Sequence, residues 1–138
     1  MTTNYDVAAC ARGYIGTPFH HQGRLKGGGI DCAGLIICVA HELNISSFDI
    51  QSYTRTPNPR VYLSVLNDNL DEDTTGVFVP GQVLSFAFAR YQQHLGITVT
   101  STTMVHAIEQ HLTHELTLSE TWIKRLRGVW RYRGVTYG

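Results

Sequence analysis

The first third of the chain carries apolar residues at helical spacing. Residues 3–15 predict a first helix, because apolar side chains recur every three or four positions at Val7, Cys10, Ala11 and Tyr14. A second apolar stripe predicts a central core helix from about Asp31 to Leu43. Residues 19–30 between them are rich in glycine and have no periodicity, so we expect a loop there.

The second half of the chain has the patterns of short strands. Residues 76–88, "GVFVPGQVLSFAF", predict two strands separated by a Pro-Gly turn, and residues 94–100, "HLGITVT", alternate between apolar and small or polar positions. Further strands are expected at 102–107, 114–119 and 128–134, with short helices at 60–70 and 120–126. Helices followed by a run of strands indicate an α+β class with an antiparallel sheet.

Length and charge narrow the function classes. With 138 residues, the chain is expected to form a single domain over 1–138. Eleven basic and eleven acidic side chains give no net charge, so a nucleic-acid partner is not expected. The longest apolar run, Leu35–Ala40, is too short for membrane insertion, and the N-terminus lacks the features of a secretory signal. We therefore expect synthesis in the cytoplasm without a signal peptide.

Cys32 stands where the glycine-rich loop meets the second helix. The chain has three cysteines, an odd number that predicts free thiols. With Asp31 as the helix cap, Cys32 falls in the first turn, where the helix dipole and free N–H groups favour a thiolate. The glycines at 27–29 would leave such a nucleophile accessible. The alternative, a small core residue, suits Cys10 and Cys38 better, since both lie in or beside apolar stripes.

Two of the seven histidines are placed to serve a thiol nucleophile. His94 opens one predicted strand and His106 ends the next, so a tight turn near Ser101 would bring the two together. His94 could then take the thiol proton while His106 fixes the orientation of its ring. A zinc site built from Cys32 and histidines is the alternative, but no HExxH or CxxC motif occurs, so we expect no metal. His111 and His114 are expected to be exposed strand or turn residues.

Four segments together resemble a known family. "GTPF", "GGGIDCAGL", "PGQVLSF" and "HLGITVTSTTMVHA" occur in the order of the NlpC/P60 family of cell-wall cysteine peptidases, from Gly16 to Ala107. The resemblance implies a reduced papain-like fold, with a nucleophile-bearing helix packed on a small antiparallel sheet. It implies Cys32 as nucleophile, His94 as base and His106 as the third polar residue. It also implies a peptidoglycan stem peptide as substrate, often cut between D-γ-glutamate and a diamino acid, and no cofactor.

A narrower resemblance concerns the biological setting. The segment "ARGYIGTPFHHQGRLKGGGIDCAGL" and the ending "LRGVWRYRG" are most similar to the subgroup found in phage tails and gene-transfer particles. This implies phage-like tail-tip proteins as partners and a particle-associated enzyme delivered to the wall. An injected antibacterial toxin, a catalytically idle tail-tip component and a different acyl chemistry on the same fold remain alternatives.

Three positions depart from the family pattern. Ala33 replaces a serine, and Gln82 replaces an aspartate in a way expected to affect only the turn. Phe19 stands where many members have a tyrosine whose hydroxyl helps to position the oxyanion or substrate. We hypothesise that His20 or His21 supplies that donor instead. The candidates for substrate or oxyanion contact are therefore Phe19, His20, His21 and Asp31.

Overall fold

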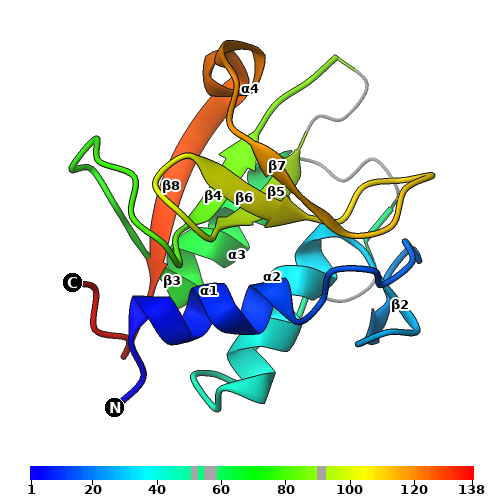
Figure 1. Ribbon diagram of the computed structural model, residues 1–138, viewed down its shortest axis with the longest axis horizontal. Helices are drawn as coiled ribbons and strands as arrows, with labels where there is room; N and C mark the ends of the chain where they lie inside the picture. The colour runs from blue at the N-terminus through cyan, green and yellow to red at the C-terminus, as the bar shows by residue number, and fades with distance from the viewer. Residues whose placement is uncertain (51–52, 55–58, 90–92) are drawn as a thin grey trace.

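The structure is a computed structural model, and it describes residues 1–50, 53–54, 59–89 and 93–138. The helices α1 (Asn4–Arg12) and α2 (Cys32–Glu42) lie together below a curved sheet, and the short helix α4 (Glu120–Arg125) lies at the opposite end (Figure 1). The helix α3 (Pro59–Asn69) leads into the sheet. The predicted α+β class is confirmed.

The sheet has six strands, all paired antiparallel, in the order β3-β8-β4-β5-β6-β7. Their bounds are β3 Leu70–Glu72, β4 Val83–Phe86, β5 His94–Thr98, β6 Thr103–His106, β7 His114–Thr117 and β8 Leu126–Tyr132. Strands β4 to β7 follow one another as neighbours in space, while β8 returns to lie between β3 and β4. The two chain ends lie near each other, where Thr3 bridges to Thr136 (Figure 1).

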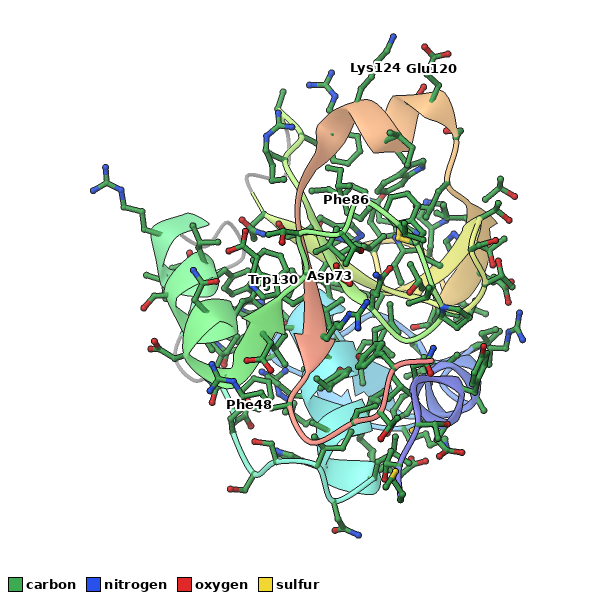
Figure 2. All side chains as sticks on the ribbon, turned by 90° about the vertical axis from the view of Figure 1, so that its left-hand side faces the viewer. Phe48, Asp73, Phe86, Glu120, Lys124 and Trp130 are labelled. Atoms are coloured by element: carbon green, nitrogen blue, oxygen red, sulfur yellow. The ribbon has the colours of Figure 1, made fainter. Side chains whose placement is uncertain are left out.

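Apolar side chains bury both faces of the sheet. Val83, Leu95 and Ile97 belong to the large core formed with α1 and α2, whereas Leu84 and Phe86 belong to a smaller core beside α4. Figure 2 shows Phe86 beneath α4 and Glu120 and Lys124 directed outward from that helix. Because both faces are covered, every residue of β5 is buried, including the polar ones.

Local signals fix the starts of the helices. Thr3 and Asp6 form a reciprocal capping box at α1, and Asp31 caps α2 as predicted. The helix α1 ends at Arg12, before the expected residue 15, with a turn following it. Among the described residues, no helix combines the length and apolar character needed to traverse a membrane.

A small hairpin occupies the region expected to be a loop. Strands β1 (Arg24–Leu25) and β2 (Gly29–Ile30) pair antiparallel, and Gly27 in the turn has φ +77°, a conformation that favours glycine. The glycines at 27–29 therefore make a turn and close packing. None of them lines the pocket described below within the described part of the chain, so their effect on the accessibility of Cys32 stays a prediction.

The strand expected within residues 76–79 is absent, and only β4 forms from the predicted pair. The reason is the side chain of Gln82. Its Oε1 accepts from the N–H of Val79 at 3.1 Å, and its Nε2 donates to the carbonyl of Val77 at 3.0 Å and to Asp73 Oδ2 at 2.8 Å. These backbone groups are satisfied by a side chain rather than by a neighbouring strand. Gln82 thus organises residues 73–79 and not the turn alone.

Candidate active site

Cys32 is the first residue of α2, immediately after its cap. The carboxylate of Asp31 accepts from the N–H of Gly34 at 2.8 Å, which satisfies one free donor of the first helical turn. A Cβ at Gly34 would lie 2.3 Å from the carbonyl oxygen of Gly23, so only glycine permits this close approach of the preceding loop. The Asp-Cys-Ala-Gly segment therefore fixes both the helix start and the loop beside it.

Asp31 is a buried anchor of the site. Besides Gly34, its oxygens accept from the N–H of Gln22 at 2.8 Å, from Arg24 Nη1 at 3.2 Å and from the hydroxyl of Tyr53. These bonds join the loop before the hairpin, strand β1 and the segment around Tyr53 to the start of α2. Asp31 is a candidate for substrate contact. In the structure its carboxylate bonds to the protein itself, and these bonds hold the helix start that carries Cys32.

The Cys32 thiol is half-buried and electrostatically disfavoured as an anion. Burial, together with the neighbouring carboxylate of Asp31, raises the pKa of the thiol to about 12, although N–H groups of Leu95, Ala33 and Cys32 oppose this shift. The N–H groups of the helix start favour the thiolate, as expected, but burial and Asp31 outweigh them. The sulfur needs a base to remove its proton.

His94 and His106 meet as predicted from the strand ends. His94 begins β5, His106 ends β6, and Nε2 of His94 lies 2.8 Å from Nδ1 of His106. Burial lowers the pKa of His94 to about 4. Burial, followed by the proximity of the other histidines, lowers that of His106 to about 2. Both imidazoles are consequently neutral at neutral pH, and a neutral imidazole can accept a proton.

One pocket brings Cys32 and His94 together. Among its lining residues are Phe19, His21, Asp31, Cys32, Tyr53 and His94. Phe19 is half-buried and is held there by its bridge to Ile30, just ahead of the nucleophile candidate. His20 is exposed and lies outside the described lining, with its Nδ1 bonded to the carbonyl of His21 at 3.0 Å. Of the two hypothesised donors, the structure therefore places only His21 in the pocket.

The sequence profile of the NlpC/P60 family matches residues 16–131, which include the pocket residues and all of the sheet except Tyr132 at the end of β8. The chain belongs to the NlpC/P60 family. No curated protein matches it at a significant level.

Solved structures show the same fold. A protein similar to a lipoprotein of the NLP/P60 family from Staphylococcus aureus is 21% identical, with a TM-score of 0.63. An NlpC/P60 family protein from Bacillus cereus is 18% identical with a TM-score of 0.68, and the NlpC/p60 domain of the peptidoglycan hydrolase SagA is 19% identical with 0.66. All three cover 94% of this chain, which in turn spans 41%, 40% and 98% of theirs.

Sequence reasoning missed one histidine of this NlpC/P60 site. His114 is half-buried rather than exposed, and its Nε2 lies 3.1 Å from Nε2 of His106, so the expectation for it is wrong. The cause is the register of β6 and β7, which sets His106 directly opposite His114. His111 is exposed, as expected. The sequence did contain a signal for this contact: His106 and His114 lie eight residues apart on two consecutive predicted strands.

Several residues that line or shield the pocket could not be identified from a motif. Tyr53, Tyr62, Gln93 and Glu109 line the pocket, and no local motif marks any of them. The indole of Trp122 on α4 lies 5.9 Å from the ring of His94 and 5.3 Å from that of His106, measured between centroids. Trp122 thereby helps to exclude water from the histidine pair. Among the described residues, no three His, Cys, Asp or Glu side chains are arranged to hold a metal ion.

Proposed function

We propose that this NlpC/P60 domain is a cysteine peptidase that hydrolyses peptidoglycan stem peptides, with Cys32 as nucleophile and His94 as base. The observation that carries the proposal is the shared pocket of Cys32 and His94, with His94 held by a hydrogen bond to His106. A thiol, a neutral imidazole and a third group that orients the imidazole are the parts that nucleophilic acyl transfer requires.

The protonation states of Cys32 and His94 determine the order of the proton transfers. Since the thiol and the imidazole are both neutral, His94 takes the thiol proton as the sulfur attacks the amide carbonyl. His94 then protonates the leaving amine as the C–N bond breaks, which leaves a thioester on Cys32. Water attacks the thioester with His94 as base, and this releases a carboxylic acid and the free thiol. In this proposal the backbone N–H of Cys32 stabilises the oxyanion in both steps.

Family membership supports a cell-wall peptidase, and one structural relative, SagA, is described as a peptidoglycan hydrolase. The finer assignments rest on the motif resemblance. They are cleavage between D-γ-glutamate and a diamino acid, and delivery to the wall by phage-like tail-tip partners. An injected toxin would use the same site. A catalytically idle tail-tip component is disfavoured, because a buried chain of histidines beside a thiol costs desolvation that a purely structural domain has no need to bear.

Mass spectrometry of digested wall tests the proposal. Purified peptidoglycan with diaminopimelate or with lysine in its stem peptides is incubated with the parent protein and with Cys32→Ala. The proposal predicts new stem-peptide fragments from the parent alone, whose masses identify the bond. The absence of fragments from both wall types would overturn it.

A further inference from the structure

Four groups form a continuous hydrogen-bonded chain that runs from the pocket to the surface. Nε2 of His94 contacts Nδ1 of His106 at 2.8 Å, and Nε2 of His106 contacts Nε2 of His114 at 3.1 Å. Nδ1 of His114 contacts the carbonyl oxygen of Leu112 at 2.8 Å. The last group differs from the others because a carbonyl oxygen can only accept.

That carbonyl fixes the direction of every bond in the chain. His114 must carry a proton on Nδ1 to donate to Leu112, so its Nε2, when the ring is neutral, can only accept. His106 must then donate from its Nε2 and accept at its Nδ1. His94 must in turn donate from its Nε2. The proton-free nitrogen of His94 is therefore Nδ1, which is the form that a base for Cys32 requires.

For a neutral His114, the neutrality of His94 and His106 leaves one set of tautomers that satisfies all three bonds. Burial lowers the pKa of both His94 and His106, so each ring carries one proton at neutral pH. Within the chain, Nε2 of His94 faces His106, and His106 has one histidine at each of its two ring nitrogens. A neutral imidazole whose proton shifts from one nitrogen to the other would break its bond to the next ring, so the tautomers change together or not at all.

The Leu112 carbonyl is itself held by the glycine-threonine-proline segment. Leu112 bridges to Pro18, the N–H of Thr113 donates to the carbonyl of Thr17 at 2.8 Å, and the N–H of Gly16 donates to the carbonyl of Thr113 at 2.8 Å. On its other side, the carbonyl of Pro18 accepts from the N–H of Ile30 at 3.1 Å. One short segment thus connects the end of the histidine chain to the residue before Asp31 and Cys32.

We propose that His114 is a positioning residue that, through His106, locks His94 in the Nε2-protonated tautomer and so keeps Nδ1 available to the thiol of Cys32. The proposal deepens and rests on the proposed function, in which Cys32 and His94 are the reacting pair. His114 acts only through His106 and has no direct contact with the reacting atoms. It extends the family's three-residue site by one member and by a backbone anchor.

Two substitutions at His114 separate tautomer control from packing. His114→Phe keeps a ring against His106 but removes both nitrogens. His114→Gln keeps an amide oxygen that can accept from His106 and an amide N–H that can donate to Leu112. His111→Phe is the matched control, since His111 is exposed and its ring lies 6.0 Å from that of His114 without joining the bonded chain.

Three readouts are measured on each variant. Ring-nitrogen NMR of the full-length protein reports the tautomers of His94 and His106 and needs no substrate. The rate of alkylation of Cys32 by iodoacetamide, read by peptide mass spectrometry, reports how readily the thiol loses its proton. The kcat and KM for cleavage of a soluble stem peptide report catalysis. His94→Ala is included in the last two as a reference for complete loss of the base.

The expected result is a mixed or inverted tautomer population in His114→Phe, slower alkylation of Cys32, and a kcat reduced by about 10- to 100-fold with KM little changed, which is part of what a general base contributes. His114→Gln restores the parental tautomers and most of kcat, and His111→Phe matches the parent. The inference about His114 is overturned if His114→Phe keeps the parental tautomers and the parental alkylation rate of Cys32 and His94→Ala slows that alkylation. If His94→Ala also leaves alkylation and cleavage unchanged, the proposed Cys32–His94 pair itself is wrong.

Discussion

His94 and His106 share a hydrogen bond of 2.8 Å inside a nearly dry part of the fold, where each residue is at most 3% exposed. The bond joins the first residue of one strand to the last residue of its neighbour. It gives each buried imidazole a polar partner without a charge, and this is why neither ring needs to be protonated at neutral pH. The neutral pair has consequences for stability and for catalysis.

The first prediction concerns acid sensitivity of the fold. A buried histidine with a lowered pKa binds its proton less readily in the folded than in the unfolded state, so the free energy of unfolding falls as pH drops from the unfolded pKa to the folded one. With a folded pKa of about 4, His94 alone should cost about 2 kcal/mol between about pH 7 and about pH 5. Urea denaturation at the two pH values measures this loss.

The control for that experiment is His94→Gln, which removes the titrating group and leaves an amide. Its free energy of unfolding should depend on pH less steeply than that of the parent over the same interval. Identical pH dependence in the two proteins would show that His94 is not a buried neutral base.

The second prediction concerns the indole that covers the histidines. Trp122→Ala removes rings packed at 5.1 Å against Phe86 and 5.3 Å against His106, and should destabilise the fold by about 2 kcal/mol. Water then reaches His94, so its pKa rises toward the ordinary value and the acid limb of the pH–rate profile moves to higher pH. Ile123→Ala, at a residue 40% exposed on the same helix, should leave that limb in place. An unshifted profile in Trp122→Ala would contradict the shielding role.

The third prediction compares two carboxylates that contact one arginine. Arg24 bonds to buried Asp31 at 3.2 Å and to the more exposed Asp49 at 3.1 Å. Asp31→Ala removes a helix cap and a buried ion pair and should cost about 3 kcal/mol or more, whereas Asp49→Ala should cost less than about 1 kcal/mol. Denaturant titration of both variants checks the order, and equal losses would show that Asp31 is not the anchor of the site.

The fourth prediction concerns the donor hypothesised to replace the family tyrosine. His21 lines the pocket beside Tyr53, with ring centroids 5.4 Å apart, whereas His20 bonds to a backbone carbonyl outside it. We expect His21→Ala to lower kcat/KM by at least about 10-fold and His20→Ala to leave it unchanged, because a lost donor to the developing charge slows the reaction. Equal rates in the two variants and the parent would remove His21 from the mechanism.

Local sequence signals were sufficient for the centre of this site. The cap at Asp31 and the apolar stripe behind it place Cys32 in a first helical turn, and alternation on either side of a short turn brings His94 to His106. These features depend on neighbours within a few residues or on adjacent strands. The helix start and the pairing of strand ends could therefore be predicted with no knowledge of the rest of the fold.

The surroundings of the site depend on contacts between distant segments. Tyr53 reaches Asp31 across a stretch with no readable pattern, and Trp122 reaches the histidines only because α4 folds back over the sheet. His114 contacts His106 because of the register between β6 and β7, and the irregular connection at residues 107–113 hides this register in the sequence. The raised pKa of Cys32 could not be predicted either. The effect of the helix start is local and visible in the sequence, whereas burial of the thiol depends on the whole fold.

In the proposed mechanism the thiol of Cys32, and no other thiol, performs the chemistry. The most direct measurement is the rate of stem-peptide release from peptidoglycan by Cys32→Ala and by Cys38→Ala, a matched change at the buried thiol further along the same helix. We expect Cys38→Ala to release the same fragments as the parent and Cys32→Ala to release none. Release by Cys32→Ala at the parental rate would contradict the proposed mechanism.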